Sequence, residues 1–444
     1  MSSLFGAVAA LVVAVVVGTS SSVSVSAFTP STITISRAMM HHPTSITTTS
    51  LRLSDTINNP LADMSDERKS NLFQSLLRDL QIEGVPLLGC DANQVSTLNA
   101  AIWTTMAELS DNHEAQRVCL IMEAIPTSAL LAFAEDFTVL KTQVRLMEYL
   151  PELKRFSISV LGKGLGPALL IETEERADDE EKSAVTSLKA MESAFDKDKT
   201  ITALKSFIGR VVVGLEACPY TKSVDLSAVG LEQRGITPGP IGYRYSPTTD
   251  ACMAMSMFWN CICEMMSTPE VNLSSIMLSL PGIGMGATRE AHNRFAAVVE
   301  LMGRYLCLFR GDGAFGLVHF HPAYDRSIIH PLAKPSYGHL PPMSWLRPIL
   351  KMGGHGDKAE ILTDDELALS NFQRRAPHTA INILRMTQVN AAAGSKSIVD
   401  LDLGDGRTEK ASGITLYTRN TLRMAEMGRD ALQTAVDAEV AMQN

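Results

Sequence analysis

The chain has 444 residues, of which 45% are hydrophobic, and a formal net charge of −9. This length allows two domains with hydrophobic cores, and the acidic balance with scattered Lys and Arg argues against a nucleic-acid partner. Seven cysteines occur without the dense spacing of a disulfide scaffold, so we expect mostly reduced and buried thiols.

The first 54 residues have the composition of a targeting sequence. Residues 11–17 form an apolar run too short to span a membrane, and Val25-Ser26-Ala27 is similar to a cleavage site, so residues 1–27 are predicted to be a signal peptide. Residues 28–54 contain many Ser and Thr and no acid, which is typical of a transit peptide. With Phe28 directly after the junction, the two segments resemble the bipartite plastid-targeting presequence of algae with secondary plastids. We therefore expect a protein of the plastid (chloroplast stroma), with no membrane span in the mature chain.

Hydrophobic periodicity predicts a small α+β unit over residues 60–172. Its expected elements are helices that open at Ser65, Asp91 and Pro126 and strands at 118–122, 155–160 and 168–171. Residues 162–166 (GKGLG) join the last two strands and lack the spacing of a dinucleotide or Walker motif, so we expect a hairpin turn and no phosphate loop. The charged segment 173–200 is predicted to be a linker, because blocks of like charge repel.

Helix and strand signals alternate in residues 201–444, which predicts an α/β domain with a small, largely parallel sheet and crossover helices. The expected strands are 241–245, 274–280 and 315–320, and the expected helices are 204–215, 249–266 and 289–309. Residues 321–342 are rich in Pro and have little periodicity, so we expect a long ordered loop or lid. The last signals are a capping box at 363–366, a hairpin turn at 404–406 and a long helix from about Leu416.

Four segments in this domain carry a family resemblance. In order they are 211–220 (VVVGLEACPY), 320–324 (FHPAY), 346–347 (LR) and 419–420 (RN) with Gly428 eight residues later. The pattern resembles the signature of the uncharacterised family known as domain of unknown function 1415, over residues 200–430. The family's Asn-Arg-Ser-Pro-Tyr-Pro block is not preserved before Pro342, and Pro348 stands where the family has Glu. That family has no established reaction, so the resemblance implies positions and no mechanism.

Cys218 and His321 are the candidate catalytic residues. A reactive thiolate needs a helix N-terminus or a cation nearby, whereas Cys218 follows the end of a predicted helix. Three roles for Cys218 stay open: a buried structural thiol, a redox or nucleophilic residue, and a metal ligand. His321 ends a predicted strand, where α/β folds bind ligands, and the alternative is an imidazole bound by loop backbone. His319 and His321 project from the same face of that strand, a spacing at which two imidazoles can share a metal with a third ligand from Asp325, His330 or His339.

The predicted ligand-binding residues are Tyr324, Arg347, Arg419 and Asn420. The arginines are expected to hold an anionic group, and the alternative for Arg419 and Asn420 is a structural role at the last helix. We expect an enzyme or small-molecule binder with a pocket near Cys218 and His321, and the residues identify no cofactor. The alternative is a non-catalytic plastid protein-interaction or assembly factor that uses the N-terminal unit and the acidic linker. A thiol-based redox protein would need a second cysteine within disulfide reach of Cys218.

Overall fold

The computed structural model defines the fold over most of the chain after residue 84. The residues that it describes are 34–38, 49–50, 85, 87–90, 92, 94–110, 114–122, 125, 127–144, 147–161, 168–175, 179–218, 221–309, 311–327, 340–393, 399–404, 406–411 and 413–443. The predicted signal peptide, the Ser65 helix and the turn at 162–166 lie outside these residues. Within the described part, no helix combines the length and the apolar character needed to cross a membrane.

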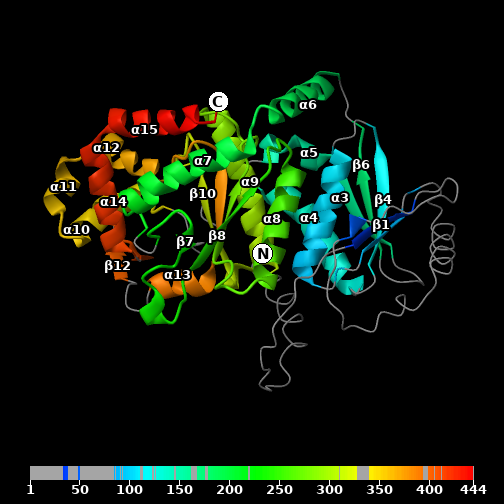
Figure 1. Ribbon diagram of the computed structural model, residues 1–444, viewed down its shortest axis with the longest axis horizontal. Helices are drawn as coiled ribbons and strands as arrows, with labels where there is room; N and C mark the ends of the chain where they lie inside the picture. The colour runs from blue at the N-terminus through cyan, green and yellow to red at the C-terminus, as the bar shows by residue number, and fades with distance from the viewer. Residues whose placement is uncertain are drawn as a thin grey trace, which may run out of the picture.

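A six-stranded sheet forms one side of the molecule, with strand order β2-β1-β3-β4-β6-β5. Its strands are β1 (Thr34–Ala38), β2 (Thr49–Ser50), β3 (Leu87–Cys90), β4 (Gln116–Met122), β5 (Phe156–Leu161) and β6 (Ala168–Thr173). β3 and β4 are parallel, and the other pairs are antiparallel. The helices beside this sheet are α3 (Val95–Ser110), α4 (Thr127–Gln143) and α5 (Pro151–Lys154) (Figure 1).

The second sheet has five strands in the order β10-β11-β9-β8-β7. They are β7 (Leu226–Ser227), β8 (Gly239–Tyr245), β9 (Ser275–Ser279), β10 (Phe315–Phe320) and β11 (Ala380–Arg385). β8 pairs parallel with β9, and α8 (Ala251–Ser267) and α9 (Arg289–Leu308) connect β8 to β9 and β9 to β10. β11, which the sequence did not predict, lies between β9 and β10 and is antiparallel to both, so β8, β9 and β10 run in one direction. The predicted mixed α/β class is confirmed.

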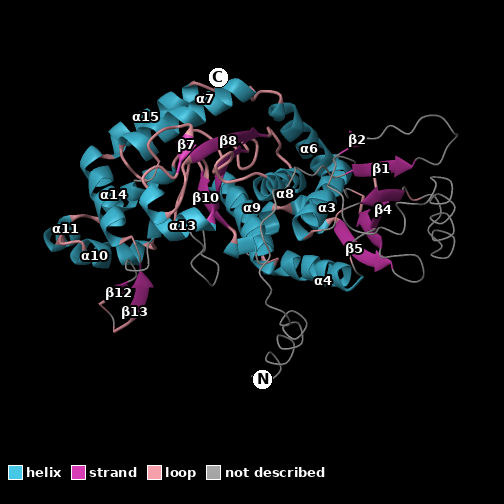
Figure 2. Cartoon of the chain, turned by 60° about the horizontal axis from the view of Figure 1, so that its bottom comes forward, coloured by secondary structure: helices cyan, strands magenta, loops and turns pink. Residues whose placement is uncertain are grey.

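The two sheets enclose one continuous hydrophobic core. α3 packs against α8, and buried side chains of α3, α4, α8 and α9 belong to a single cluster. The indole of Trp103 on α3 lies edge-on to the ring of Tyr305 on α9, with 5.3 Å between the centroids. Figure 2 shows these helices between the two sheets, with α7 and α15 beyond the second sheet. Because α3 is covered by the first sheet and by α8, it is buried on most of its surface.

Further helices and one hairpin complete the described part of the chain. They are η2 (Met147–Tyr149), α6 (Asp179–Glu192), α7 (Lys197–Phe207), the π-helix η3 (Ile208–Gly214), η4 (Glu232–Arg234), η5 (Gly311–Gly313), α10 (Met343–Met352), α11 (Gly356–Ile361), α12 (Asp364–Ala368), η6 (Leu369–Arg374), α13 (Met386–Ala393), the hairpin of β12 (Val399–Asp402) and β13 (Thr408–Ala411), α14 (Ile414–Met427) and α15 (Arg429–Ala441).

Local signals account for several of these boundaries. The capping box is confirmed, because the Thr363 side chain accepts from the Glu366 N–H and the Glu366 carboxylate accepts from the Thr363 N–H. The single long helix expected at the C-terminus is wrong. Gly428, with φ of 75°, separates α14 from α15, because this backbone conformation ends a helix. The predicted charged linker contains helix α6.

Candidate functional site

Three chain segments meet at one edge of the second sheet. Residues 280–288 follow β9, His321 follows β10, and residues 377–379 precede the antiparallel strand β11. Carboxyl ends of same-direction strands therefore meet here, which is the edge at which open α/β sheets bind ligands.

His321 is fully buried at this edge and bound by backbone groups. Its Nε2 lies 2.7 Å from the carbonyl oxygen of Gly284, and its Nδ1 accepts a hydrogen bond of 3.0 Å from the N–H of Ala323. Because Nδ1 accepts, Nε2 carries the proton and donates it to Gly284. Burial lowers the pKa of His321 to about 3, and the neighbouring His292 adds to this shift. The imidazole is therefore neutral at physiological pH and joins β10 to the loop that follows β9.

A group of aromatic rings surrounds His321. The ring of Phe295 stacks on it at 5.2 Å, and the buried ring of His292 lies 5.0 Å away. His319 is also buried, with its ring 5.6 Å from that of Tyr324. No group of three or more His, Cys, Asp or Glu side chains among the described residues is arranged to hold a metal ion, and the possible ligands His330 and His339 lie outside them.

Cys218 is half-buried in a turn that α14 holds in place. The side-chain amide of Asn420 donates to the carbonyl oxygen of Ala217 at 3.2 Å, and Arg419 donates to that of Glu216. Glu216 has φ of 50°, a conformation that a non-glycine residue keeps only where its surroundings fix it. Arg419 and Asn420 thus act on the backbone before Cys218.

All seven cysteines of the chain are free thiols. Burial raises the pKa of Cys119 to about 11 and that of Cys261 to about 12, so these thiols stay protonated in the core. No disulfide partner for Cys218 exists in this structure, as a dithiol mechanism would require.

Arg347 binds residues of the neighbouring helices α11 and α12. Its Nη2 donates to Oδ1 of Asp364 at 2.7 Å, and its Nη1 donates to the carbonyl oxygen of Ala359. The side chain therefore ties α10 to α11 and α12, and its guanidinium already binds a carboxylate and a carbonyl oxygen.

The residue that links the predicted positions is Arg374, which the sequence did not single out. Its carbonyl oxygen accepts from the N–H of His321 at 3.1 Å, and its guanidinium lies over the ring of Phe320 at 5.2 Å. The guanidinium also interacts electrostatically with Tyr324 and Cys218. Arg374 thus interacts with Cys218, His321 and Tyr324, which come from two of the four segments that carry the family resemblance.

A cavity of about 360 Å³ lies next to the residue that follows His321. Pro322 forms part of its wall, the loop after β9 supplies residues 284–287, and Phe195, His378 and Val440 line the rest together with smaller contributors. Most of the lining is apolar. His378 is nearly fully buried, with Nε2 3.2 Å from Oγ of Ser279, and burial lowers its pKa to about 4, so this polar wall is uncharged.

The loop after β9 has the sequence Gly282-Ile283-Gly284-Met285-Gly286. A Cβ atom on Gly282 would lie 2.3 Å from the carbonyl oxygen of Pro247, and one on Gly284 would lie 2.3 Å from that of Ala291. Gly284 also has φ of 63°. These positions need glycine because the loop packs directly against backbone. The alternating glycines between a predicted strand and a predicted helix were the signal that could have identified this loop from the sequence.

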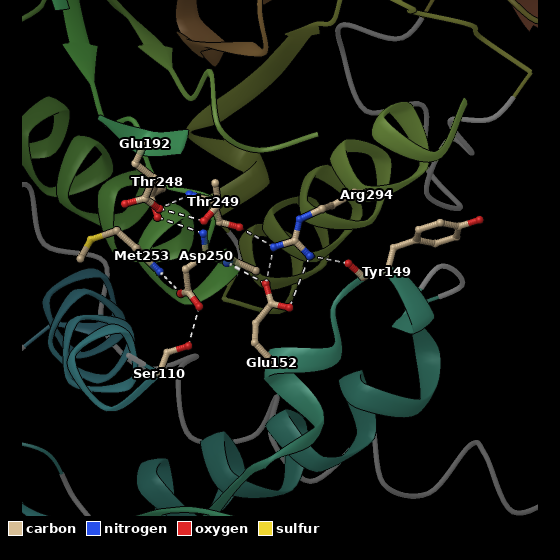
Figure 3. Close-up of polar contacts among 10 residues, drawn as sticks. Ser110, Tyr149, Glu152, Glu192, Thr248, Thr249, Asp250, Met253 and Arg294 are labelled. Atoms are coloured by element: carbon tan, nitrogen blue, oxygen red, sulfur yellow. Dashed lines mark hydrogen bonds and ion pairs between the residues drawn. The ribbon is translucent and has the colours of Figure 1, made fainter. Parts of the chain in front are cut away.

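A second buried polar cluster joins the two sheets' helices (Figure 3). Nη2 of Arg294 on α9 donates to Oε1 of Glu152 on α5 at 2.7 Å, and the same oxygen accepts from the N–H of Ala251 at 2.9 Å. Asp250 caps α8 by accepting from the N–H of Met253 at 2.9 Å. Burial raises the pKa of Asp250 to about 6, and the nearby charge of Glu152 adds to the shift. These contacts connect α5, which lies beside the first sheet, with α8 and α9, which belong to the second sheet.

No protein-family model, no curated protein and no solved structure matches this chain. The resemblance to the domain of unknown function 1415 family therefore rests on the four sequence segments alone. Any function of the site has to follow from its own geometry.

Proposed function

We propose that the protein binds a small organic molecule at the carboxyl edge of its second sheet, as an enzyme or as a binding protein. The cavity of about 360 Å³ beside His321 is the observation that carries this proposal. It is concave, mostly apolar and placed where α/β sheets bind ligands, and its polar lining residues are His378, Thr379 and Gln443.

The lining favours a neutral, largely apolar ligand with one hydrogen-bonding group. Phe195, Met285 and Val440 offer apolar contact, whereas His378 offers an uncharged imidazole that can donate or accept. The packed glycine loop gives the cavity a rigid wall, which lowers the entropy lost on binding. In this proposal His321 positions the loop and takes no part in proton transfer, because both its ring nitrogens bind backbone.

Ligand-observed NMR with a library of small aromatic and aliphatic compounds tests the proposal. Ala194 lies at the exposed rim of the cavity, so Ala194→Trp should fill the opening without disturbing the core. Ala190→Trp is the matched control, because Ala190 is an exposed residue of the neighbouring helix α6 that does not line the cavity. We expect hits that bind the wild type and Ala190→Trp and lose affinity for Ala194→Trp. Hits that bind all three proteins equally would contradict this location.

We also propose that the protein acts in the plastid stroma, on the strength of the presequence composition. Fusion of residues 1–54 to a fluorescent protein, expressed in an alga with secondary plastids, should direct it to the stroma. Secretion of the fusion would contradict the transit-peptide part of the prediction, and a cytosolic fusion would contradict both parts.

A further inference from the structure

One polar atom in the wall of the apolar cavity has no partner in the fold. The described residues that line the cavity carry no charge, and their polar side chains are those of His378, Thr379 and Gln443. The Thr379 hydroxyl donates to the carbonyl oxygen of Ile283 at 2.7 Å. Nε2 of Gln443 donates to that of Pro377 at 3.0 Å. Nδ1 of His378 has no hydrogen-bond partner among the described residues, and this side chain is only 4% exposed. A buried polar atom without a partner is costly, so a ligand that pairs with Nδ1 gains affinity.

The other ring nitrogen of His378 lies next to a buried hydroxyl group. Its Nε2 is 3.2 Å from Oγ of Ser279, the last residue of β9. Ser279 is fully buried and does not line the cavity. Within the part of the chain that the structure describes, this hydroxyl makes no other hydrogen bond. A serine hydroxyl has one proton to donate, and Nε2 of His378 is the acceptor open to it.

This pairing decides between the two neutral tautomers of His378. Burial lowers the pKa of His378 to about 4, so the ring carries a single proton at neutral pH. A proton on Nε2 would leave the Ser279 O–H without an acceptor in the core, where no ligand reaches it. A proton on Nδ1 lets Ser279 donate to Nε2, and the donor left over belongs to a residue of the cavity wall. Gln443 opposes the pKa shift of His378 but makes no hydrogen bond to its Nδ1. In the Nδ1–H tautomer, a ligand in the cavity can therefore satisfy every donor of the Ser279–His378 pair.

We infer that the cavity binds neutral carbonyl compounds, such as ketones or esters, whose oxygen accepts a hydrogen bond from Nδ1 of His378. This inference rests on the proposed function and names the ligand class of the same cavity. A carbonyl oxygen accepts and does not donate, so it complements an N–H group. A carboxylate would lose its hydration against a wall that carries no positive charge, and a hydrocarbon would leave Nδ1–H unpaired. Ser279 is the positioning residue, because its O–H directs the ring proton to Nδ1.

Acetophenone and ethylbenzene test the ligand class, because their shapes are similar and only acetophenone has a carbonyl oxygen. In ligand-observed NMR titrations we expect the full chain to bind acetophenone about fivefold more tightly than ethylbenzene, the effect of one hydrogen bond. His378→Phe keeps an aromatic ring and removes the donor, so it should bind both compounds equally. His355→Phe is the matched control, because His355 is an exposed residue before α11 that does not line the cavity, and this variant should keep the wild-type preference.

The tautomer of His378 gives a second readout that needs no ligand. Long-range proton–nitrogen correlation spectra of the full chain with isotope-labelled histidine distinguish a proton on Nδ1 from one on Nε2. The signal that is lost in His378→Phe belongs to His378. We expect the proton on Nδ1 in the wild type, and a larger share of the Nε2–H tautomer in Ser279→Ala, because no hydroxyl then donates to Nε2. The preference of Ser279→Ala for acetophenone should decrease accordingly.

These readouts separate failure of the inference from failure of the proposed function. Equal affinity of the wild type for the two compounds, an unchanged preference in His378→Phe, or a proton on Nε2 in the wild type would each overturn the inference. Each of these results leaves the proposed function standing, because the cavity still binds the apolar probe. Absence of binding of both compounds to the wild type would contradict the proposed function and this inference together. If His378→Phe fails to fold, the wild-type preference and the response to Ser279→Ala decide the question.

Discussion

Replacement of Glu152 by glutamine tests whether a buried ion pair holds the two parts of the molecule together. Glu152 is 6% exposed, and its Oε1 accepts from both Arg294 and the N–H of Ala251 (Figure 3). Glutamine keeps an oxygen for Ala251, so the substitution removes mainly the negative charge and weakens the neutralisation of Arg294. Loss of one partner of a buried pair costs about 3–5 kcal/mol. Asp250 is the remaining carboxylate near Arg294, so we expect the lower end, about 3 kcal/mol.

Urea unfolding at pH 7, followed by tryptophan fluorescence, gives this loss as a decrease in the free energy of unfolding. Glu172→Gln is the matched control, because its partner Arg117 is largely exposed, and we expect a loss below about 1 kcal/mol there. A loss for Glu152→Gln that is below about 1 kcal/mol, or no larger than in the control, would refute the inference that this pair stabilises the junction.

Three other predictions follow from the described contacts. The pKa of Asp250 is raised from 3.8 to about 6, so its contribution to the free energy of unfolding is complete below pH 4 and is lost as the pH rises through 6. In urea titrations, the free energy of unfolding of the wild type relative to Asp250→Asn should therefore decrease by about 3 kcal/mol between pH 4 and pH 7. The pKa of His321 is lowered from 6.5 to about 3, so its contribution to the free energy of unfolding is present above pH 6.5 and is lost on acidification. The difference in the free energy of unfolding between wild type and His321→Gln should decrease by about 3 kcal/mol from pH 7 to pH 4. A difference that does not change with pH would show that the His321 ring is not buried in its neutral form. Gly284→Ala should lower the free energy of unfolding by about 2–4 kcal/mol, and Gly286→Ala by about 1 kcal/mol. Both glycines have positive φ, but only a Cβ atom on Gly284 would meet backbone atoms. Equal losses of stability for the two variants in thermal unfolding would contradict the close packing of the loop.

Elements with strong local signals were predictable from the sequence. The strand expected at 315–320 has the bounds of β10, and the buried helices expected at 249–266 and 289–309 correspond to α8 and α9. Each is a long apolar or periodic segment with a clear start, such as the Asp250 cap of α8. β11 is as long as β10 and was missed because Asn382 interrupts its apolar residues, so its pairing with two neighbouring strands is what makes it a strand.

The candidate site was predictable only in part. The Phe-His-Pro-Ala-Tyr segment drew attention to the correct edge of the sheet, and His321 and Tyr324 lie there. Arg347 has the residue type that an anion site needs, but its counterion Asp364 comes from a helix whose position the sequence does not give. The same limitation hid Arg374, because its contacts with His321 and Phe320 join segments that are distant in the sequence.

The sequence by itself determined the α/β class, the main helices and strands, the compositional features of the presequence and the segment that ends at Tyr324, because these follow from local periodicity and residue chemistry. Tertiary structure alone decided the insertion of β11, the single core shared by both sheets, the cavity beside the glycine loop and the pairing of each charged group. The physical reason is that burial and counterions are properties of contacts between distant segments. Glu152 binds Arg294, and Arg347 binds Asp364, only after the chain has folded.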